Sequence, residues 1–597
     1  MTLDNARQTL REVFGFESFR PGQEDIVAAI LEGRDVLAVM PTGSGKSLCY
    51  QLPALLTPGV TVVASPLIAL MRDQVAQLRA NGVEAAALNS ANDPAENRRV
   101  VEMLMEGRLR LLYAAPERLA RADTVEMLRR ARIARVAIDE AHCVSQWGHD
   151  FRPEYLALGH VAEALGAQTV AFTATADAAT RTDIAGRLFK AEPRIFIGGF
   201  DRPNLSLAMR AKKGAKDQVL DFVAGHPGAS GIVYCSSRAR TEEFAELLNQ
   251  RGFQALPYHA GLPQEVRDAN QDAFLREDGV VMAATIAFGM GIDKPDVRFV
   301  VHADLPKNIE AYYQEIGRAG RDGLPAATLT LYGMEDIRLR RMQIEDSQAS
   351  DDQKRVERQR LGALLSLCEA PRCRRQTLLA YFGEQAEPCG NCDLCVEGVQ
   401  TFDGTVDAQK VMSAILRTGS RFGTEHLVNV LMGTASDQVL QFGHDRLPTF
   451  GVGAERSRNE WRSIFRQLYA AGLIWMDFAE HGRWSLTEEG SQVLRGRATI
   501  QLRSDVLGRK ERKKRGATAP VDIGRADPAL LSALKALRLT LAVAEGVPAY
   551  VVFADRTLIE MATHKPRSLA EMSEIHGVGQ AKLARYGQAF LDKVAEF

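Results

Sequence analysis

Met40-Pro41-Thr42-Gly43-Ser44-Gly45-Lys46-Ser47 is the stretch that decides the fold of the first part of this chain. It follows an apolar run, residues 36–39, that reads as a buried strand, and it precedes a helix-like run, residues 48–56. In such a unit the glycines let backbone N–H groups face phosphate oxygens, and the helix N-terminus adds its positive dipole end. We expect Lys46 to meet the β- and γ-phosphates of a nucleotide and the Ser47 hydroxyl to hold Mg²⁺. The other loop residues expected to bind the nucleotide are Thr42, Gly43 and Gly45.

A second apolar run, residues 136–138, ends in the acidic segment Asp139-Glu140-Ala141-His142. In doubly wound sheets, ligands lie beyond the carboxyl ends of the strands. Asp139 is therefore expected to reach Mg²⁺, and Glu140 to orient and deprotonate the attacking water. An acidic pair after a strand is commonly a solvated turn, but its combination with a phosphate loop favours catalysis.

Short apolar strands alternate with helical stretches in two parts of the chain, residues 20–176 and residues 217–332. The pattern predicts an α/β fold with two doubly wound lobes. The second part has strands, such as residues 232–235 and 297–301, but no second Gly-x-Gly-Lys-Ser loop. The sequence therefore predicts one ATP site and a different task for the second lobe.

That task is indicated by residues 313–323, which contain Arg318 and Arg321. Two arginines three residues apart on a helix share one face. If that face borders the nucleotide of the first lobe, either side chain can act as an arginine finger, an element that accelerates phosphoryl transfer by about 10³ to 10⁵. Hydrolysis would then depend on closure of the cleft between the lobes, which couples chemistry to movement.

Seven segments together resemble the motif series of superfamily 2 helicases, and of RecQ helicases in particular. They are residues 19–23, 41–47, 65–70, 139–142, 172–176, 288–295 and 314–322. The similarity spans most of residues 15–335 and implies two tandem RecA-like lobes and 3′ to 5′ movement on DNA. It also implies that Gln23 reads the adenine edge with help from Arg20, and that Thr173 and Thr175 link the ATP site to the nucleic acid.

The loop after the acidic segment is rich in aromatic and cationic side chains and resembles the aromatic-rich loop of RecQ proteins. We expect Trp147 and Phe151 to stack on single-stranded bases, at about 1–3 kcal/mol per base, and Arg152 to add positive charge. Core packing is the alternative for two aromatic residues four positions apart. The place of the loop beside Glu140 favours DNA binding.

Five of the eight cysteines fall between residues 368 and 395. Such clustering in a reducing compartment indicates a metal site rather than disulfides. Four thiolates suit tetrahedral Zn²⁺ and leave no ligand position open, so we expect a structural site; a redox pair is the alternative. Cys368 lies on an apolar helical stripe and is expected in the core. The predicted zinc ligands are Cys373, Cys389, Cys392 and Cys395.

Residues 459–487 have the pattern of a helix followed by a β-hairpin, which is the ending of a winged helix. By resemblance to the RecQ family, the hairpin tip, residues 478–483, is expected to open the first base pair of a duplex. His481 or Phe478 would be the wedge. A plain hairpin turn is the alternative.

Residues 526–596 read as a small helical bundle that looks like the helicase-and-RNase-D C-terminal (HRDC) domain. We expect residues 575–583 to form a helix–turn–helix whose glycines are free for the approach of phosphate. Its expected task is auxiliary DNA binding with Tyr550 as a base-stacking residue, and a core role for Tyr550 is the alternative. The preceding basic run, residues 509–515, is interpreted as a solvated linker.

The composition limits the classes of partner. The formal net charge is -1, so binding to nucleic acid must depend on local patches, and residues 404–517 carry 18 Lys and Arg against 12 Asp and Glu. No apolar run approaches the length of about 18 residues that indicates a membrane span. The N-terminus lacks the order of a signal peptide. We expect a cytoplasmic, nucleoid-associated protein with no membrane partner.

The predicted domains follow from these segments. They are a RecA-like ATP-binding lobe over residues 1–205, a second RecA-like lobe over 206–338, a zinc-binding segment over 339–403, a winged helix over 404–505, a basic linker over 506–522 and an HRDC bundle over 523–597.

The sequence thus predicts an ATP-dependent DNA helicase of repair or recombination, with ATP, Mg²⁺ and structural Zn²⁺ as cofactors. The expected partners are single-stranded DNA and duplex junctions, together with a single-strand-binding protein or recombination proteins. Two rival functions stay open. An RNA helicase would unwind RNA duplexes equally well, since only the 2′-OH separates the two substrates locally. A nucleic-acid-binding scaffold would keep only a vestigial ATP site.

Overall fold

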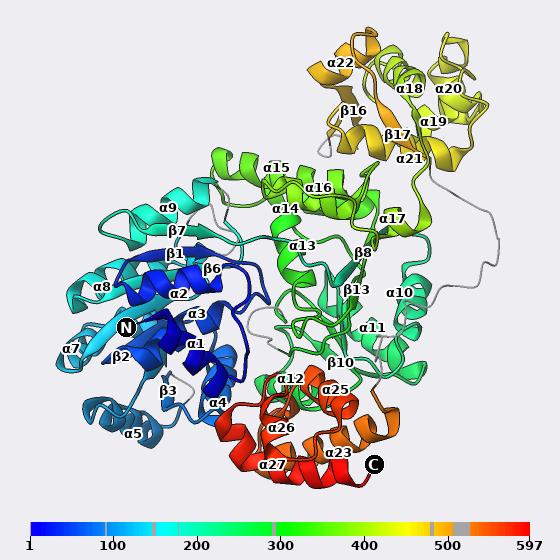
Figure 1. The fold of residues 1–597 in the computed structure, drawn as a ribbon. Helices are drawn as coiled ribbons and strands as arrows, with labels where there is room; N and C mark the ends of the chain where they lie inside the picture. The colour runs from blue at the N-terminus through cyan, green and yellow to red at the C-terminus, as the bar shows by residue number, and fades with distance from the viewer. Residues whose placement is uncertain are drawn as a thin grey trace.

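The chain forms two α/β lobes, a helical segment that contains the cysteine cluster, a winged helix and a C-terminal helical bundle (Figure 1). The computed structural model describes residues 2–89, 92–145, 151–176, 178–288, 294–477, 483–504 and 526–597. Some of the residues singled out in the sequence lie outside the described residues: Trp147, Phe478, His481, residues 289–293 and the basic run 509–515.

The first lobe is a parallel sheet between helices. Its strands are β1 (Val36–Val39), β2 (Val60–Ala64), β3 (Ala85–Leu88), β4 (Leu111–Ala114), β5 (Ile133–Ile138), β6 (Gln168–Thr173) and β7 (Arg194–Ile197), in the spatial order β3-β4-β2-β5-β6-β1-β7. Its helices are α1 (Leu3–Glu12), α2 (Gln23–Leu31), α3 (Lys46–Leu56), α4 (Ile68–Ala80), α5 (Pro94–Met105), α6 (Pro116–Leu119), α7 (Ala122–Arg130), η1 (Ala141–Val144), η2 (Pro153–Ala157), α8 (Leu158–Leu165) and α9 (Ala178–Leu188). The apolar runs β1, β2 and β4 are buried throughout, as expected of strands covered on both faces. The phosphate loop follows β1 and the acidic segment follows β5, so both lie at the carboxyl edge of one sheet.

The second lobe repeats this architecture, which confirms the predicted pair of doubly wound lobes. Its elements are β8 (Leu205–Ala211), α10 (Ala215–Ala224), β9 (Gly231–Tyr234), α11 (Arg238–Gln250), β10 (Gln254–Tyr258), α12 (Gln264–Arg276), β11 (Val280–Ala284), β12 (Phe299–His302), α13 (Ile309–Ile316) and β13 (Ala326–Tyr332). The parallel strands have the order β10-β11-β9-β12-β13-β8. The chain crosses from the first sheet to the second through residues 198–204, which we call the inter-lobe linker.

Two further modules follow the lobes. The cysteine segment contains α14 (Met334–Glu345), α15 (Asp351–Cys368), α16 (Arg374–Tyr381) and α17 (Asp393–Glu397). The winged helix contains β14 (Thr401–Asp403), α18 (Thr405–Arg417), α19 (Thr424–Met432), α20 (Asp437–Gln441), η3 (His444–Arg446), α21 (Arg458–Ala470), β15 (Ile474–Asp477), β16 (Arg483–Leu486), α22 (Glu488–Leu494) and β17 (Gln501–Arg503). Strands β15 and β16 pair antiparallel after α21, so the predicted helix and hairpin are confirmed. Glu369 joins the two modules, because it pairs with Arg466 at 2.8 Å and with Arg503 at 3.2 Å.

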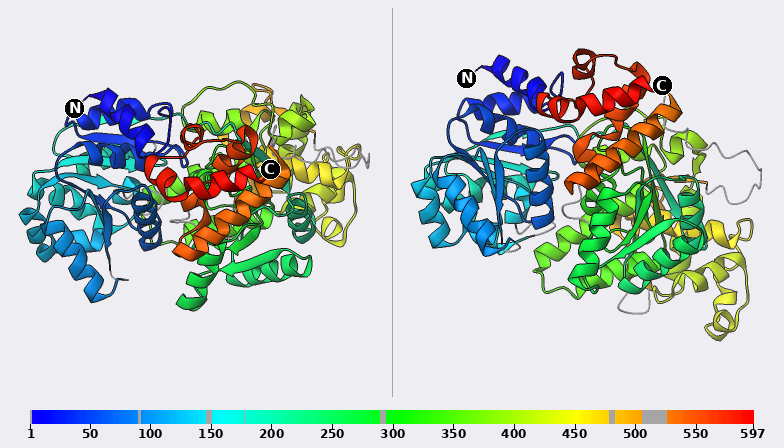
Figure 2. Two further views of the ribbon diagram at one scale, coloured as in Figure 1. Left: turned by 60° about the horizontal axis from the view of Figure 1, so that its bottom comes forward. Right: turned by 90° about the horizontal axis from the view of Figure 1, so that it is seen from below.

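The C-terminal bundle touches both lobes (Figure 2). It consists of α23 (Pro528–Glu545), α24 (Ala549–Val552), α25 (Asp555–His564), α26 (Leu569–Ser573) and α27 (Gln580–Ala595), which confirms the predicted helical bundle. On the side of the first lobe, the N–H of Gly577 donates to the carbonyl of Gly15 at 2.8 Å. On the side of the second lobe, Arg538 pairs with Asp278 at 3.4 Å. The bundle therefore bridges the two lobes.

The turn between α26 and α27 is not open for phosphate, so that expectation is wrong in this arrangement. A Cβ added at Gly579 would lie 2.6 Å from the carbonyl oxygen of Val13. A Cβ added at Gly15 would lie 2.7 Å from the nitrogen of Gly579. The glycines instead allow the bundle and the first lobe to pack backbone against backbone.

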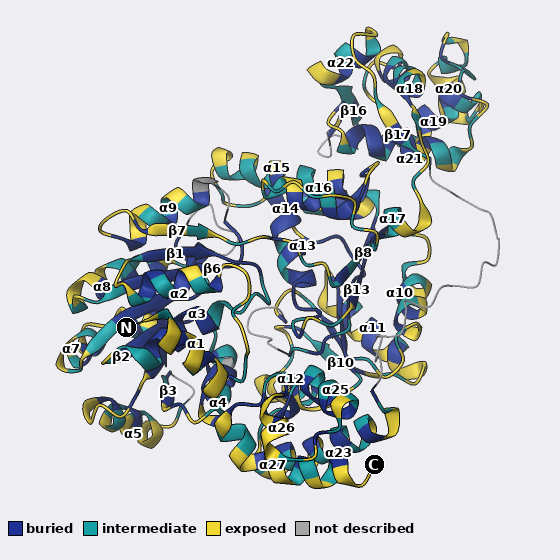
Figure 3. Ribbon diagram, viewed as in Figure 1, coloured by how far each residue is buried: buried dark blue, intermediate teal, exposed yellow. Residues whose placement is uncertain are grey.

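The burial of side chains distinguishes the sheets of the two lobes from the surrounding helices. The central strands of both large sheets are buried, the edge strand β7 of the first sheet is mostly exposed, and many exposed residues lie on the outer faces of the helices (Figure 3). Cys368 is fully buried near the end of α15, which confirms its predicted place in the core. Among the described helices, none combines the length and the apolar character that a membrane crossing requires.

Candidate active site

The phosphate loop has the conformation that its glycines suggest. Gly43 and Gly45 have φ angles of 82° and 81°, a left-handed backbone that disfavours other residues. Gly45 is also the N-cap of α3, so the dipole of an 11-residue helix points at the loop. The Lys46 amine lies 3.2 Å from the carbonyl of Met40, inside the loop.

The two residues predicted to recognise adenine lie against this loop. The Gln23 amide donates to the carbonyl of Ser44 at 2.9 Å and to that of Gly45 at 3.2 Å. Arg20 donates to the carbonyl of Gly43. Burial lowers the pKa of Arg20, but a guanidinium stays charged at neutral pH.

The acidic segment turns sharply at the end of β5. Glu140 has a φ of 51°, which is uncommon for a residue other than glycine and marks a backbone held under strain. Asp139 is 6% exposed, and one of its carboxylate oxygens accepts the N–H of Glu140 at 3.0 Å. This turn directs consecutive carboxylates to one edge of the sheet.

His142 connects the acidic segment to the next strand. Its Nδ1 lies 2.9 Å from Thr173 Oγ1, and that hydroxyl donates to the carbonyl of Thr175 at 3.1 Å. Burial, reinforced by the charges of Lys46 and Arg152, lowers the pKa of His142 to about 3, so the ring is neutral at physiological pH. Thr175 Oγ1 in turn accepts from the amide of Gln314 in the second lobe at 3.4 Å. A continuous polar path therefore runs from the acidic segment of one lobe to α13 of the other.

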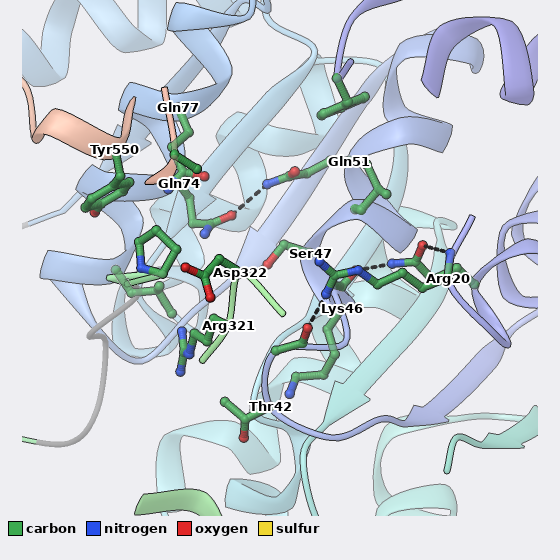
Figure 4. A pocket seen from close by; sticks show the side chains of 18 of the residues that line it. Arg20, Thr42, Lys46, Ser47, Gln51, Gln74, Gln77, Arg321, Asp322 and Tyr550 are labelled. Carbon is green, nitrogen blue, oxygen red and sulfur yellow. Dashed lines mark hydrogen bonds between the residues drawn. The ribbon is translucent and has the colours of Figure 1, made fainter. Parts of the chain in front are cut away.

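One cavity of about 1030 Å³ brings these residues together. Figure 4 shows Lys46, Ser47 and Arg20 of the first lobe around the same space as Arg321 and Asp322 of the second. The predicted nucleotide-binding and catalytic residues that line the cavity are Arg20, Gln23, Thr42, Gly43, Gly45, Lys46, Ser47, Asp139, Glu140, Arg318 and Arg321.

The prediction that Arg318 and Arg321 share one face of a helix was wrong, although both residues line the cavity. Helix α13 ends at Ile316, so Arg318 and Arg321 lie in the turns beyond it and do not share a helix face. Gly320 has a φ of 59°, which a right-handed helix cannot continue. The turn, rather than helical periodicity, places both arginines in the wall of the cavity that the phosphate loop also lines.

The C-terminal bundle supplies a third wall of the cavity, which the sequence did not indicate. Arg556, His576 and Lys582 line it, and the ring of His576 lies 5.2 Å from that of Phe16 in the first lobe. Tyr550 also faces the cavity (Figure 4). No local pattern could reveal this wall, because it depends on how separate domains pack.

The described residues predicted to bind DNA lie in two places, the loop after the acidic segment and the C-terminal bundle. Phe151 is partly buried, and Arg152 beside it donates to the carbonyl of Pro66 at 3.4 Å, so this loop reaches the segment after β2. Tyr550 is 8% exposed and packs with Ala80 of the first lobe. Its stacking on DNA stays a prediction, since it is covered in this arrangement.

The cysteine cluster has the geometry of a zinc site. The Sγ atoms of Cys373, Cys389, Cys392 and Cys395 all lie within 4.8 Å of one another. Three of the Sγ to Sγ distances are 3.5, 3.9 and 4.0 Å. Tetrahedral Zn²⁺ with bonds of about 2.3 Å requires about 3.8 Å between sulfurs, so the residues fit this metal. Burial opposes ionisation of Cys373, but N–H donors from Gln376 and Cys389 bring its pKa to about 7, which favours the thiolate.

Comparisons with known proteins match the whole of this architecture. Five family models cover consecutive parts of the chain: a DEAD/DEAH box helicase over residues 20–184, a helicase conserved C-terminal domain over 214–323, RecQ zinc-binding over 334–396, an RQC domain over 398–511 and an HRDC domain over 527–594. Two RecA-like lobes around one phosphate loop, with these modules, define an ATP-dependent helicase.

Relatives of nearly the same length narrow the class to a family. The chain is 44% identical to the ATP-dependent DNA helicase RecQ of Pasteurella multocida, over 99% of this chain and 94% of that protein. It is 43% identical to the helicase of the same name from Haemophilus influenzae, over 99% and 96%, and 38% identical to that of Bacillus subtilis, over 100% and 99%. The chain belongs to the RecQ family.

Proposed function

We propose that this chain is a DNA helicase that couples ATP hydrolysis to 3′ to 5′ movement and to separation of duplexes during repair or recombination. The observation that carries the proposal is the shared cavity, which is lined by Arg318 and Arg321 of one lobe and by the phosphate loop of the other. Unwinding removes stacking of about 1.4 kcal/mol per base-pair step, a load that only a continuous supply of ATP energy sustains.

The predicted catalytic residues of the cavity have proposed roles in hydrolysis. Lys46 stabilises the β- and γ-phosphates, and either arginine neutralises charge that develops on the transferred phosphoryl group. Glu140 orients the attacking water and accepts its proton. The Ser47 hydroxyl and the Asp139 carboxylate would hold Mg²⁺, which prefers such oxygen ligands and neutralises phosphate charge when bound.

DNA contact is proposed for the loop that follows the acidic segment. Replacing Phe151 with alanine is expected to weaken binding of single-stranded DNA by about 1–3 kcal/mol, because one stacked base loses its aromatic partner. Fluorescence anisotropy with a labelled oligonucleotide measures the change. Phe597→Ala is a matched control, since that ring is 49% exposed at the C-terminal end. Equal affinity of Phe151→Ala and the parent chain would show that Phe151 belongs to the core only.

The docked bundle is proposed to slow the exchange of nucleotide. Gly579 has an ordinary φ of -80°, so alanine there strains nothing locally, but its Cβ would lie 2.6 Å from the first lobe. Gly579→Ala is therefore expected to displace the bundle and to accelerate dissociation of ADP by about fivefold, since the opening of a covering element limits product release. Stopped-flow fluorescence with a labelled ADP measures the rate. Gly362→Ala, with open space around its Cβ, is the control. An unchanged rate would show that the bundle does not gate the site.

The deciding test is a helicase assay across forked, four-way and 3′- or 5′-tailed DNA duplexes, together with the same shapes in RNA. We expect DNA-stimulated ATP hydrolysis and unwinding that requires a 3′ tail. Equal unwinding of the RNA substrates would favour the RNA helicase instead. Absence of DNA-stimulated ATP hydrolysis would favour a nucleic-acid-binding scaffold with a vestigial ATP site. Association with the nucleoid, and with a single-strand-binding protein or recombination proteins, is part of the same proposal.

A further inference from the structure

One cation of the inter-lobe linker contacts both lobes at the active site. Arg202 Nη1 donates to the carbonyl of Thr42 in the phosphate loop at 2.5 Å. Its Nη2 donates to the carbonyl of Ala319 at 3.0 Å and to that of Gly320 at 2.9 Å, in the turn that carries the two cavity arginines. A single planar group thus spans the phosphate loop and the arginine-bearing turn.

The guanidinium fills the space between these two loops. A Cβ added at Gly43 would lie 2.8 Å from Arg202 Nη1. A Cβ added at Gly317 would lie 3.0 Å from the Cβ of Thr42, so the loops themselves are in close contact. Burial lowers the pKa of Arg202 to about 10, and the group remains charged at neutral pH. Its bonds are directed at carbonyl oxygens, whose positions are fixed by the backbone.

The linker around Arg202 is anchored on its other side. The N–H of Phe200 donates to Glu384 of the cysteine segment at 2.7 Å, and the Tyr313 hydroxyl donates to the carbonyl of Phe200 at 2.9 Å. The rings of Phe200 and Phe382 stack at 4.3 Å with an angle of 9°. The backbone that carries Arg202 therefore has a defined position relative to α13 and the cysteine segment.

Asn204 reinforces the same turn from the same linker. Its side-chain amide donates to the carbonyls of Gly320 at 2.8 Å and of Leu324 at 2.9 Å. Asn204 contacts the second lobe through these bonds, whereas Arg202 also contacts the phosphate loop. Arg202 is thus the residue suited to relate one loop to the other.

We propose that Arg202 is a positioning residue for hydrolysis, which sets the place of Arg318 and Arg321 relative to the nucleotide phosphates by bonding both loops at once. Lysine cannot replace it, because an ammonium is a point donor whereas a guanidinium presents five donors in a rigid plane. The inference rests on the proposed function, since it assigns Arg202 to the same ATPase.

The first test separates kcat from KM. Arg202→Gln and Arg202→Lys are expected to lower kcat of DNA-stimulated ATP hydrolysis about 100-fold, the scale of a misplacement of about 1 Å in a reacting group. The KM for ATP and the affinity for single-stranded DNA are expected to stay within about threefold, because Arg202 itself touches neither phosphate nor DNA in this assignment. Arg210→Gln is the matched control, an exposed arginine of β8 paired with Glu397 at the surface.

The second test asks whether Arg202 acts through the two proposed arginine fingers, Arg318 and Arg321. In a background that carries both Arg318→Ala and Arg321→Ala, adding Arg202→Gln is expected to lower the single-turnover rate of hydrolysis by less than about threefold, since both groups to be positioned are gone. A full, additive loss would overturn the proposal, as would a kcat within about twofold of the parent or an effect confined to KM. Should Arg202→Gln fail to fold, Arg202→Lys keeps the charge and carries the same measurements.

The outcomes also separate this inference from the proposed function. A parent chain without DNA-stimulated hydrolysis overturns both. A parent chain that hydrolyses ATP normally, with Arg202 variants that do the same, overturns only the role of Arg202.

Discussion

Replacing Lys46 with alanine is expected to lower DNA-stimulated ATP hydrolysis by about 10³-fold and to abolish unwinding. The Lys46 amine lies within the phosphate loop, 3.2 Å from the carbonyl of Met40, at the wall of the shared cavity. Removing a preorganised positive group at a site of developing phosphate charge costs about 10²- to 10³-fold in rate, and here the ground-state contact with the nucleotide is lost as well. A coupled assay of ATP turnover with and without single-stranded DNA measures the loss.

The control for this substitution is Lys190→Ala in the same lobe. Lys190 is 81% exposed and pairs with Glu163 at 2.9 Å, so its removal is expected to change the ATPase less than twofold. If Lys46→Ala retained more than about a tenth of the DNA-stimulated rate, the phosphate loop would not be the site of ATP hydrolysis. The alternative function, a nucleic-acid-binding scaffold with a vestigial ATP site, would then be favoured.

Replacing Cys392 with serine is expected to remove zinc and to unfold the cysteine segment. Cys392 is fully buried, and its Sγ lies 3.9 Å from that of Cys373. Structural zinc contributes binding free energy on the order of 10 kcal/mol to the folded state, so losing one thiolate of four costs several kcal/mol of stability. Metal analysis is expected to give about one zinc per parent chain and almost none per variant, with a lower thermal midpoint.

Cys368→Ala is the matched control for the zinc ligand. Cys368 is equally buried and five positions before Cys373, but it belongs to the apolar core of α15. The Cys368→Ala variant is expected to retain zinc and to lose only about 1 kcal/mol of its free energy of unfolding. Zinc retained by Cys392→Ser, or lost by Cys368→Ala, would contradict the assignment of the four ligands.

The cysteine segment is also coupled to the motor, so the loss of zinc is expected to reach the lobes. Arg374 of α16 pairs with Asp393 of α17 at 2.9 Å, and Asp393 accepts the N–H of Met209 in β8 at 2.9 Å. Glu384 holds the inter-lobe linker through Phe200. Unfolding of this segment therefore removes supports of the second lobe and of the linker.

Local sequence could predict the parts of the site whose chemistry lies within one segment. Gly43 and Gly45 specify a left-handed loop between a strand and a helix, and the apolar run before Asp139 specifies the strand whose end carries the acids. The last three of the four cysteines lie around a turn at Gly390, with φ of 70°, and their Sγ atoms lie within 4.8 Å of that of Cys373. Such features depend on contacts between near neighbours in the chain.

Periodicity failed where a helix ended earlier than its pattern suggested. The spacing of Arg318 and Arg321 fits a helical face, yet α13 ends at Ile316. The glycines at 317 and 320 and the close packing against Thr42 favour a turn there. The left-handed backbone of Gly320 and the packing of the turn overrode the helical pattern, and both arginines still line the cavity. Their role as arginine fingers stays a prediction.

The sequence by itself determined that this protein has one phosphate loop, one acidic strand end, four clustered thiols and two repeated α/β patterns, since each can be recognised from residue types and their spacing along the chain. Only the tertiary structure decided that the C-terminal bundle covers the nucleotide cavity and that Arg202 bonds two loops at once. Those contacts join residues more than one hundred positions apart, such as Arg202 with Thr42 and Gly577 with Gly15. Such contacts form only when the surfaces of separately folded parts of the chain pack together. They depend on the shape and charge of those surfaces, which a local stretch of sequence does not specify.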